Sequence, residues 1–185
     1  MEVNTLIKKE YNNILKLWLK AFWSRFGDIA VYFQKEADQF TNPFGYHIEK
    51  SFREILQGLC EDFSWDNFNP YLENLAQIRA VQEKVPSLAA NFFLDLKKVI
   101  RETLGERIIS EYGIASFLEL EDKINSLLLR FMDYYHQYRE RLYEVRLEEW
   151  KRNQYLLLKR AGFIFNEKDN IDFAVNKKNE RGDGL

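Results

Sequence analysis

The sequence predicts an all-α protein, a single domain of about six helices packed as an irregular bundle with a long last helix. Three observations point to this class. Apolar side chains recur at three- and four-residue steps through most of the chain, a spacing that places them on one face of a helix. The 185 residues include only 3 prolines, and residues 116–161 contain neither proline nor glycine. A chain of this length suits one domain with one hydrophobic core.

The N-terminal part of the chain predicts three helices. The first covers about residues 3–25 and ends at Gly27 and Asp28. The third begins at Pro43, with Asn42 as its N-cap. Between them we expect a short helix that stops before Asn42, because the residue before a proline disfavours the helical conformation. The short helix would carry Ile29, Val31, Tyr32, Phe33 and Ala37, and the helix from Pro43 would bury Phe44, Ile48, Phe52, Ile55, Leu56 and Leu59.

The middle of the chain predicts two helices joined by a corner. Pro70 suits the first turn of one helix, and Pro86 and Ser87 end that helix and cap the next. The helix from Pro70 would run through the apolar residues Tyr71, Leu72, Leu75, Ile78, Ala80 and Val81. The helix after the corner has a wide apolar stripe formed by Leu88, Ala89, Phe92, Phe93, Leu96, Val99, Ile100 and Leu104.

The last predicted helix begins at Ser116, which stands three residues before Glu119 as in a capping box, and ends at Gly162. Its length of about 45 residues corresponds to roughly 65 to 70 Å, so one end should project or the helix should kink. A seven-residue apolar repeat runs through it and fades where charged residues replace it. The repeat consists of Phe117, Ile124, Phe131, Tyr138 and Val145.

These elements divide the chain into a helical domain over residues 1–165 and a polar, flexible tail over residues 166–185. Within the tail, Ile171, Phe173 and Val175 alternate enough to allow a short strand.

Charge and cysteine content exclude several classes of protein. The 27 Lys and Arg residues nearly balance the 29 Asp and Glu residues, so no strong field favours nucleic acid or an anionic membrane. A single cysteine, Cys60, excludes an intramolecular disulfide, and the acidic residues beside it favour an inert thiol. Charged residues also interrupt the first apolar segment, which excludes a signal peptide and a membrane span, so we expect a cytoplasmic protein. These residues are Lys8, Lys9, Glu10, Lys16 and Lys20.

No motif for catalysis or cofactor binding occurs in the sequence. It contains no GxGxxG, P-loop, HExxH, CxxC or GxSxG pattern. His47 and His136 are the only histidines, and we interpret both as surface or half-buried residues rather than as ligands. The acidic clusters lack the Glu-x-x-His pairs of a diiron bundle and suit solvated helix faces. We therefore predict a protein that is not an enzyme and binds no cofactor or metal.

Basic residues bracket the corner at Pro86. Lys97 and Arg101 are i,i+4 neighbours, so two cations share a helix face and could hold an anion. The alternative is that the basic residues only keep the outer face of this helical hairpin soluble. The group comprises Arg79, Lys84, Lys97, Lys98 and Arg101.

Three segments together resemble the N-terminal domain of RsbRD-type co-antagonist proteins of the bacterial stressosome. They are QFTNPFGY at 39–46, IRAVQ at 78–82 and PSLAANFFLDLKKVIR at 86–101, and the similarity extends from about residue 5 to about residue 162. The resemblance implies a sensory input module of the stress response whose last helix commonly leads into an output domain. Because only about 20 residues follow residue 165, too few for an output domain, we expect a stand-alone module. Related stressosome sensors resemble globins without haem, which implies a globin-like arrangement of the helices.

Two hypotheses follow for the function. The first is a signalling module that contacts a protein partner, or a second copy as a homodimer, through its last helix. Its candidate contact residues are Tyr138, Leu142, Val145 and Trp150. The second is a sensor that binds a small anion at the Pro86 corner, although Arg79 could instead bond carbonyl groups at the neighbouring helix end. The candidate ligand-binding residues are Arg79, Gln82, Ser87, Lys97 and Arg101.

Overall fold

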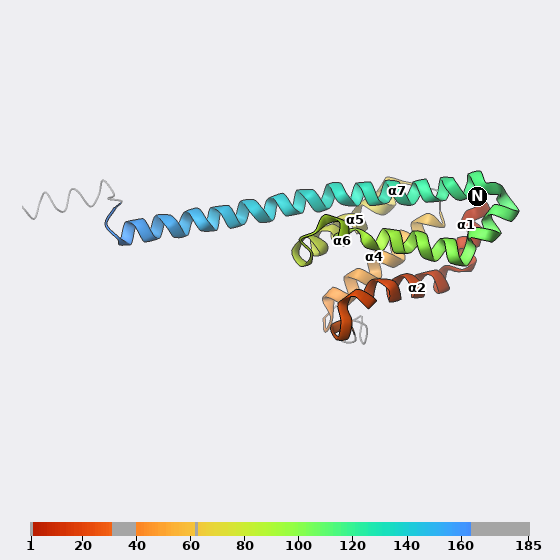
Figure 1. Cartoon of the computed structure of the whole chain (residues 1–185), viewed down its shortest axis with the longest axis horizontal. Helices are drawn as coiled ribbons and strands as arrows, with labels where there is room; N and C mark the ends of the chain where they lie inside the picture. The colour runs from red at the N-terminus through yellow and green to blue at the C-terminus, as the bar shows by residue number, and fades with distance from the viewer. Residues whose placement is uncertain (1, 31–39, 62, 164–185) are drawn as a thin grey trace, which may run out of the picture. The chain divides into compact units, whose positions relative to one another are not determined.

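The computed structural model describes residues 2–30, 40–61 and 63–163, which contain six α-helices, one 3₁₀ segment and no strand (Figure 1). The prediction of an all-α fold with a long last helix is confirmed. Residues 1–139 form one unit by their internal contacts, and the segment from residue 140 onward forms another. The elements are α1 (Glu2–Lys9), α2 (Tyr11–Trp23), η1 (Ser24–Ile29), α4 (Pro43–Leu59), α5 (Trp65–Gln82), α6 (Pro86–Ala89) and α7 (Asn91–Arg160).

The N-terminal segment forms two helices, so the prediction of one helix over residues 3–25 is wrong. α1 and α2 meet at Glu10, whose φ of −95° and ψ of 9° bend the backbone. Apolar periodicity does not reveal this bend because the buried stripe continues on both sides, with Ile7 and Ile14 both fully buried. The predicted break at Gly27 is present, with φ 55° and ψ −140°. The short helix expected around Val31 to Ala37 lies outside the described residues.

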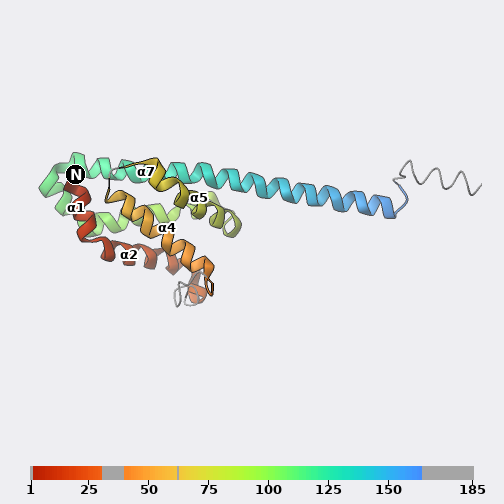
Figure 2. The same ribbon diagram turned by 180° about the vertical axis from the view of Figure 1, so that it is seen from behind.

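α4 begins as predicted at Pro43. Asn42 is its N-cap, because the Asn42 side-chain oxygen accepts a hydrogen bond of 2.8 Å from the Gly45 N–H. The predicted core positions of this helix are buried except for Phe44, which is half-buried beside Trp23. The Asn42 cap fixes where α4 begins, and the buried apolar face of this helix packs against α2 and α5. α4 and α5 run side by side (Figure 2).

α5 begins at Trp65, so Pro70 lies inside the helix and does not open it as predicted. The reason is Phe68, whose ring is fully buried and lies where a side chain on Gly58 would be. A Cβ atom built on Gly58 would approach Cε1 of Phe68 to 2.6 Å. The helix must start before Phe68 to present this ring to α4. Val81 lies within α5 as predicted, and its side chain is 68% exposed.

The corner after α5 contains a separate short helix. Pro86 opens α6, but the N-cap position belongs to Val85, and the predicted cap, Ser87, is exposed. Leu88, predicted to join the apolar stripe, is also exposed because it faces outward on this single turn. The rest of the stripe is buried as predicted, from Ala89 through the first part of α7 to Leu104.

α7 is interrupted at Gly113, whose φ of 85° and ψ of 163° are not helical. Its arms, residues 91–112 and 114–139 of the first unit, lie side by side (Figures 1 and 2). The break therefore precedes the predicted start at Ser116, and the capping box predicted there is wrong. The Ser116 hydroxyl donates to the Tyr112 carbonyl at 3.0 Å, across the break, rather than accepting from the next turn.

The buried stripe of the second arm follows the predicted seven-residue repeat only as far as Phe131. It then continues at four-residue steps through Tyr135 to Arg139, so Tyr138 is only half-buried. No described residue of α7 beyond Arg139 is buried. The predicted end at Gly162 is confirmed, because Gly162 has φ 75° and the Phe163 N–H donates to the Leu158 carbonyl at 3.0 Å.

Aromatic rings fill the centre of the first unit. The ring of Trp18 lies 3.9 Å from that of Phe52, centroid to centroid, and its indole N–H donates to the Phe92 carbonyl at 2.7 Å. Phe92 in turn lies 5.1 Å from Phe131 on the second arm of α7. Since all four side chains are essentially inaccessible to water, α2, α4 and both arms of α7 share one core.

Candidate functional site

Arg79 forms the centre of the corner between α5 and α6. The residue is only 7% exposed, and its guanidinium donates to the carbonyl oxygens of Leu88 at 3.2 Å and Ala89 at 3.4 Å. A third bond of 3.3 Å reaches the side-chain oxygen of Gln82. Leu88 and Ala89 form the carboxyl end of α6, where helix carbonyls have no partner within the helix. Arg79 therefore caps this end with positive charge.

The Arg79 guanidinium also lies over two aromatic rings of the N-terminal part of the chain. Its central carbon is 5.7 Å from the ring centroid of Phe22 and 5.9 Å from that of Phe26. Burial lowers the pKa of Arg79, and the positive charge of Arg25 acts in the same direction, whereas Glu83 opposes it. The group remains charged because an arginine does not deprotonate in proteins. In the described ranges no carboxylate forms a salt bridge with Arg79, so carbonyls, Gln82 and rings hold the cation.

Two side chains of α7 bind the carboxyl end of α5. The Tyr135 hydroxyl donates to the Glu83 carbonyl at 2.7 Å, and the Arg139 guanidinium donates to the Ala80 carbonyl at 2.9 Å. Both side chains are buried. Together with Arg79, they satisfy helix-end carbonyls on both sides of the corner. The corner is thereby bonded to the last buried turn of α7, which ends at Arg139, the last residue of the first unit.

Lys97 and Arg101, the predicted anion-binding pair, both face Glu121 on the opposite arm of α7. Arg101 lies 2.6 Å from a Glu121 oxygen, and Lys97 lies 3.6 Å from the other oxygen and 3.1 Å from the side-chain oxygen of Asn125. Partial burial acts to raise the pKa of Glu121, but bonds and charge from Arg101 and Lys97 outweigh it, so the pKa lies below its ordinary value. A carboxylate of the chain thus already occupies the place that an anion would take.

The five candidate ligand-binding residues fall into separate groups. Arg79 bonds to Gln82, Lys97 and Arg101 share Glu121, and Ser87 is exposed on α6. In the described part of the chain, no hydrogen bond joins these groups. The anion site at this corner stays a prediction.

Metal and nucleophilic chemistry find no support in the described ranges. No three histidine, cysteine or acidic side chains there are grouped so that they could hold a metal ion. Burial raises the pKa of the Cys60 thiol to about 11, and its sulfur donates to the Leu56 carbonyl at 3.3 Å. At neutral pH such a thiol is protonated and a poor nucleophile. Burial, more than the neighbouring acidic residues, raises the pKa of the Cys60 thiol.

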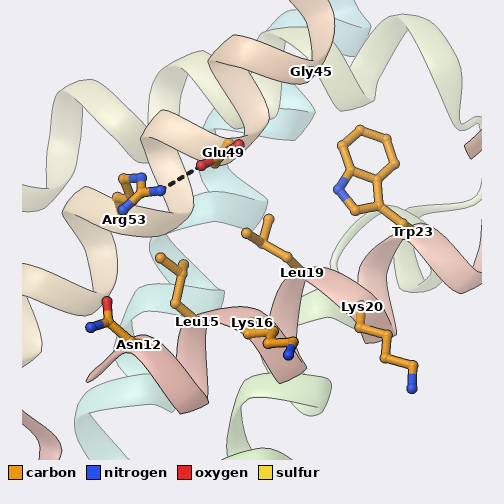
Figure 3. Close-up of a pocket in the computed structure, with 9 residues that line it drawn as sticks. All are labelled: Asn12, Leu15, Lys16, Leu19, Lys20, Trp23, Gly45, Glu49 and Arg53. Carbon is orange, nitrogen blue, oxygen red and sulfur yellow. Dashed lines mark hydrogen bonds and ion pairs between the residues drawn. The ribbon is translucent and has the colours of Figure 1, made fainter. Parts of the chain in front are cut away.

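A groove between α2 and α4 was not anticipated from the sequence. It has a volume of about 540 Å³, with Leu15 and Trp23 on its floor and the Glu49–Arg53 ion pair of 2.6 Å on the α4 side (Figure 3). Lys16 and Lys20 line its edge, and Figure 3 shows their side chains directed away from α4. The groove arises from the packing of two helices, so no pattern within either helix could have indicated it.

The predicted contact residues of the last helix differ in their surroundings. Tyr138 is half-buried and donates from its hydroxyl to Glu73 at 2.9 Å, and Leu142 is also half-buried. Val145 and Trp150 are 53% and 59% exposed. Among the described helices, none combines the length and the apolar character that crossing a membrane requires.

The fold and these contacts define an all-α domain in which polar side chains connect helix ends. The family described as the RsbT co-antagonist protein rsbRD N-terminal domain matches residues 13–150, and the chain belongs to this family. The resemblance predicted from the three sequence segments is thus confirmed, and the chain is a stressosome-related signalling input domain. Comparisons with curated proteins and with solved structures produce no match.

Proposed function

We propose that this input domain is a non-enzymatic sensory module that passes its signal through protein–protein contacts made by residues 140–160. The observation that carries the proposal is the exposure of large apolar side chains on this segment. Eight of them are each between 42% and 61% exposed: Tyr143, Val145, Leu147, Trp150, Tyr155, Leu156, Leu157 and Leu158. Exposed apolar surface of this density on a soluble helix is typical of an interaction site.

The composition of the segment supports a protein partner. Trp150 and Tyr143 are of the residue types that contribute most to binding when a partner buries them. Arginine and glutamate side chains surround them, as at the polar rim of an interface. A partner that covered Trp150 would remove from water the most exposed aromatic side chain of this segment.

The corner supplies the input side of the proposed mechanism. Tyr135 and Arg139 hold the carboxyl end of α5, and Arg139 directly precedes the exposed segment in the chain. A stimulus that rearranged the α5–α6 corner would have to lengthen or break these two bonds. The last anchored turn of α7 would then change immediately before the residues that contact the partner.

The test is the association of the full chain, measured by sedimentation velocity for self-association and by copurification from extract of the native host for other partners. We expect Trp150→Ala and Leu157→Ala to weaken association. Leu129→Ala, which truncates a side chain that is 64% exposed in the first unit, is the matched control and should leave association unchanged. Association that is equally strong in all three variants would contradict the proposal, as would a wild-type chain that is monomeric and captures nothing.

A further inference from the structure

We propose that the groove between α2 and α4 binds a small, elongated carboxylate with an apolar tail. The carboxylate group lies at the Arg53 end of the groove, and the tail extends toward Trp23. None of the residues that line the groove belongs to the Pro86 corner or to residues 140–160. The groove is therefore a binding site in addition to the contact segment of the proposed function.

The two ends of the groove differ in chemical character. Figure 3 shows Asn12 and Arg53 at one end and Trp23 and Gly45 at the other, since α2 and α4 run in opposite directions. From Asn12 to Trp23, α2 extends over about 16 Å. Polar side chains thus lie at one end of an elongated groove, and an apolar surface lies at the other. A ligand with the same asymmetry fits it best in one orientation.

Three apolar side chains of α2 form the surface for the tail. Leu15 and Trp23 are only 4% and 5% exposed, and Leu19 between them is half-buried. Four-residue steps separate the three, so the helix presents them as one continuous row. Gly45 lines the Trp23 end from α4 and contributes no side chain that would fill it. An extended aliphatic tail can pack along this row and remove its remaining exposed surface from water.

Arg53 provides the anchor for the carboxylate group. A guanidinium has five N–H donors in a planar fork that matches a carboxylate, and the 2.6 Å bond to Glu49 uses one of them. The Arg53 side chain is 50% exposed, so a ligand can reach it from the groove. Of the side chains that line the groove, Lys16, Lys20 and Arg53 are basic and only Glu49 is acidic. The groove therefore attracts an anion rather than a cation.

The test is a titration of the full chain with sodium octanoate, followed by the indole N–H resonances of the four tryptophans. We expect a saturable shift for Trp23 and none for Trp150, which would respond if octanoate only adhered to the exposed residues 140–160. Octanol, which has the same tail without the charge, should bind about 3- to 10-fold more weakly. Butanoate, which has a shorter tail, should bind at least about 10-fold more weakly. A titration that leaves the Trp23 resonance unmoved would overturn this inference, whereas the proposed function is judged by association alone.

Substitutions on α4 test the position of the carboxylate group. Arg53→Met should weaken octanoate binding by about 3- to 10-fold, because it removes the anchoring donors. Lys50→Met, which removes one positive charge from an exposed residue of the same helix outside the groove, is the matched control and should leave binding unchanged. Glu49→Gln should act in the opposite direction and tighten binding by about 2- to 5-fold, because it removes a negative charge beside that of the ligand. Equal affinity of the three variants and the wild type would overturn the proposal.

Discussion

Arg139 donates a buried hydrogen bond of 2.9 Å to the carbonyl oxygen of Ala80, 59 residues earlier in the chain. The bond connects the last buried side chain of α7 to the carboxyl end of α5. Because that carbonyl has no partner within its own helix, a positively charged donor is well suited to it. Arg139, like Tyr135 one turn earlier, therefore bonds the corner of the domain to the last turn of α7 within the first unit.

Removing this donor should destabilise the first unit. Arg139→Ala leaves the Ala80 carbonyl without a charged donor, so we expect the free energy of unfolding to fall by about 1 to 3 kcal/mol. Urea unfolding followed by circular dichroism measures the change. Arg152→Ala, which removes the same side-chain type from an exposed position, should change stability by less than about 0.5 kcal/mol. Equal effects of the two variants would show that the bond contributes nothing specific.

Arg79 should be more sensitive to substitution than its neighbour Lys84. Arg79→Met retains apolar bulk but removes the donors to Leu88 and Ala89, so we expect a loss of about 2 to 4 kcal/mol. Arg79→Lys should recover only part of it, because one ammonium group cannot reproduce the planar guanidinium geometry. The exposed Lys84→Met is the control. Hydrogen exchange at residues 86–91 should accelerate in Arg79→Met, and unchanged exchange there would argue against the cap.

Glu121 should make stability depend on acid pH. Its pKa is lower in the folded than in the unfolded state, so its stabilising effect is complete above the ordinary value of 4.5 and is lost as the pH falls through the folded-state pKa. Glu121→Gln should be less stable than wild type at pH 7, and the difference should shrink toward pH 3. Urea unfolding of both proteins across this range is the measurement. A difference that stays constant with pH would contradict the assignment.

The predicted anion site can be tested by removing the internal carboxylate. Glu121→Gln leaves Lys97 and Arg101 without their common acidic partner. If these cations can hold a small anion, inorganic phosphate should raise the melting temperature of Glu121→Gln more than that of wild type. The further change Arg101→Met should abolish the added effect. No difference between Glu121→Gln and wild type would remove the anion-binding hypothesis for this pair.

Gly113 should tolerate a side chain poorly, in contrast to Gly105 in the same helix. Gly113 has φ 85° and ψ 163°, a conformation essentially restricted to glycine, and an added Cβ would meet no atom within 4 Å. Gly113→Ala should therefore cost about 1 to 3 kcal/mol from backbone strain alone. At the helical Gly105, an added Cβ would lie 3.6 Å from Arg101, an ordinary contact, so Gly105→Ala should be neutral or stabilising. Chemical unfolding measures the free energy of unfolding of Gly113→Ala and Gly105→Ala and so distinguishes the two outcomes.

Local features of the fold were predictable because neighbouring residues carry the signal. Asn42 before Pro43 predicts a cap, and the cap bonds to Gly45 three residues later. Gly162 predicts a helix end, and the Phe163 N–H closes it on Leu158. The bend at Glu10 was not predictable in this way, because the apolar stripe passes through it unchanged.

The candidate site could be predicted only in part. Sequence spacing identified Lys97 and Arg101 as two cations on one helix face, but their partner Glu121 comes from the other arm of α7 and becomes a neighbour only when the chain reverses at Gly113. Likewise, nothing near Tyr135 in the sequence indicates that its hydroxyl meets Glu83, 52 residues away. The α2–α4 groove was likewise not predictable, because it forms only when two separate helices pack together.

The sequence by itself determined the helical class, the caps at Asn42 and Gly162, and the family of signalling input domains, because periodicity, capping and family segments are patterns within short stretches of chain. The tertiary structure decided the roles of the charged side chains. Whether Arg79 binds an anion or caps a helix depends on which groups lie within about 3 Å of its guanidinium. Folding places the carbonyls of Leu88 and Ala89 there and buries the cation against aromatic rings, an arrangement that arises only when distant segments pack together.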